Sequence, residues 1–156
     1  MKWNNIIIHC SDSTWGSASE IRKWHLEKGF RDIGYHFNIP NGRIRPNFYL
    51  PELDGTVEVG RPLDGDPIVE VDEIGAHALG YNDSAIGVCL IGKNVFSMYQ
   101  LSTLTKLIVR LQLQFNIPLE RVLGHYEVDQ KKTCPNMDMT VYRRSLDPLG
   151  LFYKPQ

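Results

Sequence analysis

An almost unbroken apolar run at residues 84–92, Ser-Ala-Ile-Gly-Val-Cys-Leu-Ile-Gly, constrains the fold of this chain more than any other feature. A run of this kind, without alternating polar residues, is typical of a central strand that is covered on both faces. A second apolar segment, residues 4–10, contains three consecutive isoleucines and predicts another strand. Because a strand buried on both faces needs helices against the sheet, the sequence favours an α/β architecture.

Three helices are predicted around these strands. Ser17 and Glu20 form the pattern of a capping box, which predicts a helix that begins here and ends near Gly29. A long amphipathic helix is indicated by apolar residues at helical spacing, and residues 116–118 (Asn-Ile-Pro) end it. A last helix is expected over residues 139–146. The apolar face of the long helix consists of Leu101, Leu104, Leu107, Ile108, Leu111 and Phe115.

Further strands are expected at residues 35–39, which alternate in polarity, and at residues 55–59 and 121–125. Residues 40–75 are rich in Pro, Gly and Asp, which predicts short strands within a long surface excursion. We therefore expect residues 1–156 to form a single α/β domain, with a mixed central β-sheet flanked by α-helices.

Charge and composition exclude several classes of partner. The formal net charge is −1, and no basic cluster is larger than Lys131-Lys132 or Arg143-Arg144, whereas nucleic-acid binding needs a basic surface. No stretch approaches the roughly 20 apolar residues that cross a bilayer. The three cysteines are too few for a disulfide framework, and the N-terminus lacks the pattern of a signal peptide. We expect a monomer that is made in the cytoplasm.

Three residues far apart in the chain, His9, His125 and Cys134, have the chemistry of one zinc site. His9 lies at the end of the first predicted strand, and His125 ends the strand predicted at 121–125. Cys134 follows in a polar loop, with eight residues between it and His125. Two imidazoles and one thiolate suit zinc, and three protein ligands leave a fourth position for water, as in catalytic sites.

Each of these residues also has a simpler explanation. A histidine after an apolar strand is more often a hydrogen-bonded structural residue, and a buried thiol often behaves as a small hydrophobe. The position of Cys134 in a polar loop, between lysines and Pro135, is unusual for a core thiol. Cys10 and Cys89 lie in apolar strands, and we interpret both as packing residues, with Cys10 pointing opposite to His9.

Short motifs extend this pattern over residues 4 to 147, and their order is more specific than any one of them. They are Ile7-Ile8-His9-Cys10-Ser11, Ile21-Arg22-Lys23-Trp24-His25, Asp32-Ile33-Gly34-Tyr35-His36-Phe37, Asp54-Gly55-Thr56-Val57-Glu58, Gly60-Arg61, Ala76-His77-Ala78-Leu79-Gly80-Tyr81-Asn82, Ser84-Ala85-Ile86-Gly87-Val88-Cys89-Leu90, His125-Tyr126-Glu127-Val128 and Lys132-Thr133-Cys134-Pro135. In these motifs the chain resembles the type 2 N-acetylmuramoyl-L-alanine amidases, a family that includes small phage endolysins and the peptidoglycan recognition proteins.

The resemblance implies that one zinc ion is held by the three residues named above. It also implies cleavage of the amide between N-acetylmuramic acid and L-alanine of peptidoglycan, as in a phage or prophage endolysin that reaches the wall after release or export by another factor. Tyr35 and Lys132 match the two catalytic positions of the family, and His77 and Asn82 match positions that line its substrate groove. The loop before Cys134 is about one residue longer than in phage members, so Lys131 is the alternative catalytic lysine.

The other matching histidines are not expected to bind metal. His36 alternates with Tyr35 and is expected to face away from the metal, and His25 is expected to be structural. Residues 41–51 resemble an insertion relative to phage members and are expected to shape the groove.

Two other functions remain open from the sequence. Members of the same family hold peptidoglycan without cutting it, so a non-catalytic recognition module is the first alternative, although such members typically lack the cysteine ligand. A cysteine hydrolase that uses Cys134 with His125 is the second.

Overall fold

The two apolar runs form neighbouring strands at the centre of the sheet. The computed structural model describes residues 1–151, in which β1 (Asn5–Cys10) and β6 (Ala85–Leu90) pair in parallel, with Asn5 opposite Ala85 and Cys10 opposite Leu90. Every residue of both strands is buried. Both strands predicted from apolar runs are therefore confirmed.

In the part of the chain that the structure describes, these strands belong to a five-stranded sheet of order β5-β2-β6-β1-β7. The strand β7 (Val122–Gly124) runs parallel to β1, and β2 (Phe37–Ile39) runs parallel to β6. The edge strand β5 (Glu58–Val59) runs antiparallel to β2. The sheet is therefore mixed, as predicted.

The long helix covers one face of this sheet. It is α2 (Met98–Phe115), which begins with the capping box of Ser97 and Gln100 and ends at Asn116 in the left-handed conformation. Its buried apolar residues pack in one cluster with alternate residues of β1 and β6 and with α4 (Met139–Leu146). The members of this cluster from α2, β1 and β6 are Leu104, Leu107, Ile108, Leu111, Phe115, Ile6, Ile8, Ile86, Val88 and Leu90.

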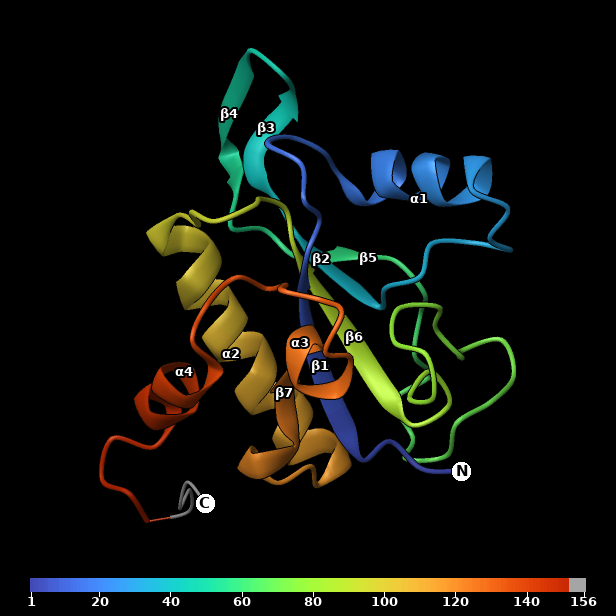
Figure 1. Cartoon of the computed structure of the whole chain (residues 1–156), viewed down its shortest axis with the longest axis vertical. Coiled ribbons are helices and arrows are strands. Elements are labelled where there is room, and N and C mark those ends of the chain that lie inside the picture. Colours follow the sequence, from blue (N-terminus) through green and yellow to red (C-terminus); the bar gives the residue numbers. More distant parts are fainter. Residues whose placement is uncertain (152–156) are drawn as a thin grey trace.

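The opposite face of the sheet is covered in part by α1 (Ala18–Glu27). Its N-cap Ser17 accepts a hydrogen bond from the backbone N–H of Glu20, where the sequence predicts the helix to begin. Ala18 and Ile21 pack there against Cys89 of β6. Figure 1 shows α1 at one end of the sheet and the short helix α3 (His125–Val128) in front of β1, so this face is left more open than the α2 face.

Alternation along β1 decides which residues reach the open face. Ile6 and Ile8 belong to the cluster with α2, whereas Ile7 packs with Ala78 and Ala85 on the other side. Because side chains two apart on a strand share a face, His9 lies on the same side as Ile7. The end of β1 therefore presents His9 to the side that α2 does not cover.

The structure differs from the predictions in three places. Residues 41–54 form a hairpin of β3 (Asn41–Arg45) and β4 (Phe48–Asp54), which projects from the body of the molecule in Figure 1. Its apolar residues are few and prolines interrupt it, so no period of two was visible. The strand predicted at 55–59 is shorter in the structure, where residues 58–59 pair with β2. The four-residue α3 was not predicted, since one turn carries no helical periodicity.

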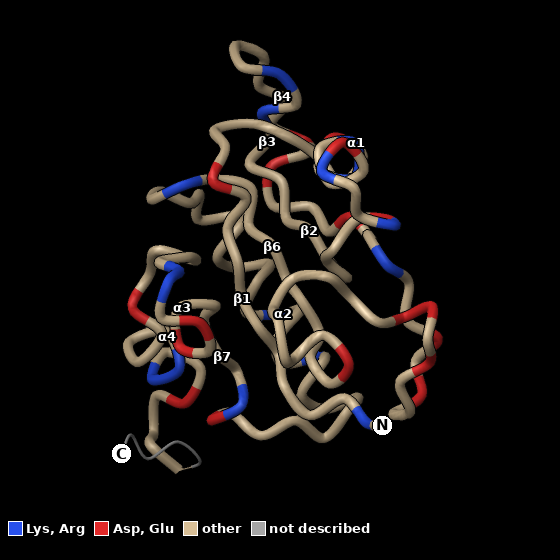
Figure 2. The backbone as a smooth tube through the Cα atoms, turned by 45° about the vertical axis from the view of Figure 1, so that its right-hand side comes forward, with Lys and Arg blue, Asp and Glu red and all other residues tan. Residues whose placement is uncertain are grey.

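The charged residues do not gather by sign on one helix or strand. Figure 2 shows Lys and Arg spread over several elements, with acidic residues more frequent along the loop between β5 and β6. None of the helices within residues 1–151 combines the length and the apolar character that a membrane span needs. The prediction that the domain extends over 1–156 includes residues 152–156, which lie outside the described residues.

Candidate functional site

His9, His125 and Cys134 converge on the open face of the sheet. His9 is near the end of β1, His125 is the first residue of α3, and their metal-binding atoms and that of Cys134 all lie within 4.8 Å of one another. Cys134 Sγ is 3.8 Å from His9 Nδ1 and 3.4 Å from His125 Nδ1. Sulfur and nitrogen ligands of a tetrahedral zinc ion lie roughly 3.6 Å apart, so the donor set and its spacing fit zinc.

Burial keeps His9 in the form that binds a metal. Its side chain is 1% exposed, and the pKa of its imidazole is lowered mainly by burial. A neutral imidazole has one nitrogen with a free electron pair. In this structure Nε2 lies 3.0 Å from His77 Nδ1, which leaves Nδ1 directed toward Cys134.

The thiol of Cys134 is held toward its thiolate form. Its pKa is lowered, chiefly by a hydrogen bond from the Cys10 thiol and then by one with His125. The pKa of Cys10 is raised by the same contact and by burial. Cys10 is buried, as its packing role predicts, but it also touches the ligand Cys134. Strand alternation did not reveal this contact, because β1 ends at Cys10 and the Cys134 loop lies beyond that end.

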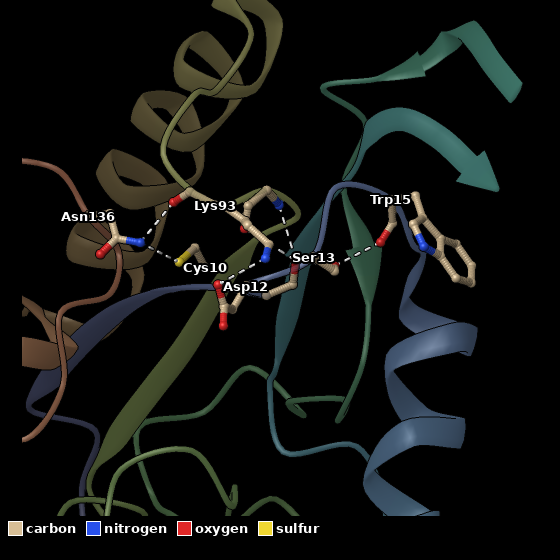
Figure 3. A network of polar contacts seen from close by, with 8 residues as sticks. Cys10, Asp12, Ser13, Trp15, Lys93 and Asn136 are labelled. Atoms are coloured by element: carbon tan, nitrogen blue, oxygen red, sulfur yellow. Dashed lines mark hydrogen bonds and ion pairs between the residues drawn. The ribbon is translucent and has the colours of Figure 1, made fainter. Parts of the chain in front are cut away.

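Backbone hydrogen bonds hold the Cys134 loop against α3. Tyr126 N–H donates to the carbonyl of Cys134 at 3.1 Å, and Asn136 N–H donates to that of Thr133 at 3.0 Å. The Asn136 amide also donates to the carbonyl of Lys93 at 2.9 Å and to Cys10 Sγ at 3.6 Å, as Figure 3 shows. The loop that follows β6 is thereby joined to the loop that carries the cysteine ligand.

The loop after β1 is tied into the same network. Ser11 Oγ accepts a hydrogen bond from Gly92 N–H at 3.0 Å, and the Asp12 carboxylate lies 3.8 Å from Lys93 Nζ. Ser13 donates to the carbonyl of Trp15 at 2.8 Å (Figure 3). These contacts fix the chain where it leaves β1, immediately after His9.

An ion pair supports the turn that carries His125. Arg143 of α4 donates to both carboxylate oxygens of Glu127, at 2.7 and 2.8 Å, and also to the carbonyl of Val122 at 2.9 Å. Glu127 in turn accepts from Gly124 N–H at 2.8 Å. Arg143 of α4 therefore holds the start of α3 in place through Glu127, and His125 is the first residue of α3. No local sequence pattern indicated this pair, because its members are 16 residues apart.

Tyr35 and Lys132, the predicted catalytic residues, both border the ligands. The Tyr35 ring centroid lies 5.1 Å from that of His9, and burial raises the pKa of the Tyr35 hydroxyl well above its ordinary value. A cleft of about 370 Å³ is lined by Tyr35, Cys134 and both lysines, Lys131 and Lys132. A second cleft of about 370 Å³ is lined by Lys132 but not by Lys131. Lys132 therefore borders both clefts, and its catalytic role stays a prediction.

The second cleft brings in the residues predicted to line the substrate groove. His77 and Asn82 both border it, together with His125 and the 95%-exposed Leu79. The Asn82 side-chain oxygen accepts from the backbone N–H groups of His77 and Ala78, both at 2.8 Å, so Asn82 also holds this loop in shape.

The remaining histidines are bonded to the backbone. The ring of His36 is fully buried between Gly87 N–H and the carbonyl of Glu73, and burial lowers its pKa to about 4. His25 Nδ1 accepts from Gly34 N–H at 2.9 Å. The arrangement of His25 agrees with the structural role predicted for it. His36 was predicted to face away from the metal, but its ring lies 5.7 Å from that of His77, which contacts His9, because Phe37 and not His36 packs on the α2 side.

The segment at 41–51 was expected to shape the groove, but it lies at a different cavity. Among the described residues, none from this segment lines either cleft beside the metal ligands. Asn41, Arg43 and Tyr49 instead line a separate cavity of about 530 Å³ with the loop that precedes α2.

Comparisons with known proteins find similar sequences and similar structures. The family model described as N-acetylmuramoyl-L-alanine amidase matches residues 1–137. The endolysin of Klebsiella phage KP32 is 33% identical over 147 residues, covering 87% of this chain and 82% of the endolysin. The amidase LysC from Clostridium intestinale URNW is similar in structure, with a TM-score of 0.74 and 25% identity, covering 94% of this chain and 87% of LysC. Wild-type PGRP-LB of Drosophila has a TM-score of 0.69 and 26% identity, covering 93% and 82%.

Proposed function

This chain belongs to the N-acetylmuramoyl-L-alanine amidase family, and from this premise we propose that it is a zinc-dependent amidase that lyses the bacterial cell wall. Its substrate is the amide bond between N-acetylmuramic acid and L-alanine of peptidoglycan, and its role is that of a phage or prophage endolysin. The observation that carries this proposal is the convergence of two imidazoles and one thiolate beside open clefts. Three protein ligands leave a coordination position open for reaction.

Zinc bound here would lower the pKa of a water molecule to about 7 and polarise the scissile carbonyl. The chain supplies the remaining electrostatic stabilisation. As the carbonyl carbon becomes tetrahedral, negative charge develops on its oxygen, which the Lys132 ammonium and the Tyr35 hydroxyl stabilise as hydrogen-bond donors. The raised pKa of Tyr35 keeps its proton in place for this role.

The clefts on either side of Lys132 and His125 accommodate the two parts of the substrate. Both residues line both clefts, so a substrate that occupies them passes over the ligand set. We assign His77 and Asn82 to the wall of one cleft, where they contact the muropeptide. The protein reaches its substrate after release or export by another factor.

The test is mass spectrometry of products from defined muropeptides, with zinc content measured on the same preparation. The expected products are peptides that begin with L-alanine, a chelator is expected to stop their release, and added zinc to restore it. Muropeptide binding without product release would instead indicate a recognition module. Full activity in a His9→Ala variant that holds no metal would contradict the zinc mechanism.

A cysteine hydrolase is the second candidate, because Cys134 Sγ lies 3.4 Å from His125 Nδ1 and its pKa is lowered. Alkylation of the thiol inactivates either enzyme, so it does not separate them. Chelation does, since a cysteine hydrolase keeps its activity without metal. Loss of activity on chelation and recovery with zinc would leave the amidase alone.

A further inference from the structure

All five histidines of the chain and Tyr35 lie in one group of neighbouring rings. The His9 ring centroid is 4.5 Å from that of His125 and 5.0 Å from that of His77. His36 lies 5.7 Å from His77, and His25 lies 5.4 Å from Tyr35. Two of these histidines are metal ligands in the proposed function. His77 is the one that joins a ligand directly to the backbone of the sheet.

One backbone carbonyl determines which ring nitrogen carries the proton in His77 and in His9. His77 Nε2 lies 3.1 Å from the carbonyl oxygen of Ala85, which only accepts hydrogen bonds, so Nε2 carries the proton of the neutral ring. His77 Nδ1 is then an acceptor, and His9 Nε2 lies 3.0 Å from it. His9 must donate from Nε2. Its Nδ1 is therefore left with a free electron pair, on the side of Cys134.

The surroundings of His77 hold its ring in place. Its side chain is buried, and its backbone N–H is held by Asn82 at 2.8 Å. The ring lies directly over Gly87 of β6, where an added Cβ would come within 2.6 Å of it. A strand residue with a side chain at this position would displace the ring.

We propose that His77 is a positioning residue of the metal centre, which fixes His9 as the Nε2-protonated tautomer and directs its Nδ1 to the metal. The inference rests on the proposed zinc site and adds a role to the contact with substrate assigned above. Metal-binding histidines commonly donate their second N–H to a carboxylate or a carbonyl group. Here the carbonyl of Ala85 acts on His9 through a second imidazole.

Two substitutions at His77 and one control separate this role from packing. His77→Leu removes the acceptor with a side chain small enough for the site, and His77→Gln keeps an acceptor and a donor. His25→Gln changes another histidine of the ring group, which accepts a hydrogen bond from Gly34 N–H and not from His9. All three are compared with the wild type in near-ultraviolet circular dichroism, which reports intact packing.

The first readout is the tautomer of His9 in metal-free protein, observed from the nitrogen shifts of its ring by NMR. The wild type is expected to carry the proton on Nε2, and His77→Leu to show a mixture of tautomers. The second readout is zinc affinity, measured by competition with a chromogenic chelator. It is expected to fall about 10- to 100-fold in His77→Leu, to recover largely in His77→Gln and to stay unchanged in His25→Gln.

Several outcomes would overturn the proposal. One is a proton on Nδ1 of His9 in the wild type, a result that does not depend on whether any variant folds. Another is wild-type zinc affinity in a folded His77→Leu protein. If such a variant showed only a higher KM for muropeptides, His77 would contact substrate without positioning His9.

The tautomer of His9 and the zinc affinity are both measured without peptidoglycan. A protein that binds zinc as expected and hydrolyses nothing would contradict the proposed function and leave the role of His77 intact.

Discussion

His9 and Cys134 are 125 positions apart in the sequence, yet His9 Nδ1 and Cys134 Sγ lie 3.8 Å from each other. The two residues are held by different means. His9 is fixed by pairing of β1 with β6, whereas Cys134 lies in a loop held by hydrogen bonds to α3 and to the loop after β6. The site therefore combines a rigid ligand from the sheet with one that depends on the loop.

Replacing the loop ligand is expected to remove the metal. In Cys134→Ser the thiolate that suits zinc is replaced by a hydroxyl that stays protonated at neutral pH, so bound zinc and activity are both expected to fall at least 100-fold. Elemental analysis and hydrolysis of muropeptides on one preparation measure this. Cys89→Ala is the control, since Cys89 is buried against α1 and is expected to keep its zinc. Zinc retained in Cys134→Ser would contradict the ligand assignment.

The adjacent lysines give a matched pair of variants. Lys132→Ala is expected to lower kcat roughly 10²–10³-fold, because a donor to the developing oxyanion is lost, while zinc content stays unchanged. Lys131→Ala is expected to stay within a few-fold of the wild type, since of the two lysines it is Lys132 that lines both clefts beside the metal ligands. Steady-state kinetics on one muropeptide measure both. The reverse order of effects would assign the catalytic role to Lys131.

Tyr35→Phe tests the second donor without changing the shape of the ring. The variant loses the hydroxyl, so kcat is expected to fall roughly 10²–10³-fold with little change in zinc affinity. The ring contact with His9, at 5.1 Å between centroids, is retained. A loss of zinc in this variant, measured by chelator competition, would mean that Tyr35 acts through the structure of the site rather than on the substrate.

Local patterns in the sequence were sufficient to predict the central strands and the ends of the main helices. The apolar runs at 4–10 and 84–92 predicted β1 and β6 because burial on both faces removes polar residues from a strand. Caps at Ser17 and near Asn116 predicted where helices begin and end. His9 lies in β1 as predicted, whereas His125 was predicted to end a strand and is instead the first residue of α3, directly after β7. That β1 and β7 are parallel neighbours, which brings the two histidines together, was not predicted.

What the sequence did not reveal depends on contacts between distant residues. The hydrogen bond from His9 to His77 joins residues 68 positions apart, and its direction depends on a carbonyl of a third segment. The contact between Cys10 and Cys134 arises only where a strand ends and a loop returns. These contacts carry no periodic or compositional signal, so they appear only once the fold is known.

The buried histidines predict how stability depends on pH. The pKa of His36 is lowered from 6.5 to about 4, mainly by burial, and the pKa values of His9 and His77 are lowered in the same direction. Between about pH 6.5 and 4 the unfolded chain therefore binds more protons than the folded one, and the free energy of unfolding falls as the pH falls. For His36 alone the full loss is about 3 kcal/mol, at 1.36 kcal/mol per pKa unit.

Urea unfolding of the metal-free protein at pH 7 and pH 4.5 measures this effect. His36→Gln is expected to be less stable than the wild type at pH 7, since it disturbs hydrogen bonds to Gly87 and Glu73, but to lose less stability on acidification. Equal free energies of unfolding at the two pH values in the wild type would contradict the prediction.

The ion pair between Arg143 and Glu127 is expected to link the stability of α4 to the metal site. Arg143 is 5% exposed and binds both carboxylate oxygens of Glu127, so Arg143→Met leaves a partly buried carboxylate without this cation. Breaking such a pair costs about 3 kcal/mol, which urea unfolding measures. Because Glu127 holds the start of α3 through Gly124 N–H, zinc affinity is expected to fall as well. Arg144→Met, at an exposed neighbouring position, is the matched control and is expected to change neither quantity. Loss of stability with unchanged zinc affinity would show that α4 supports the fold without positioning His125.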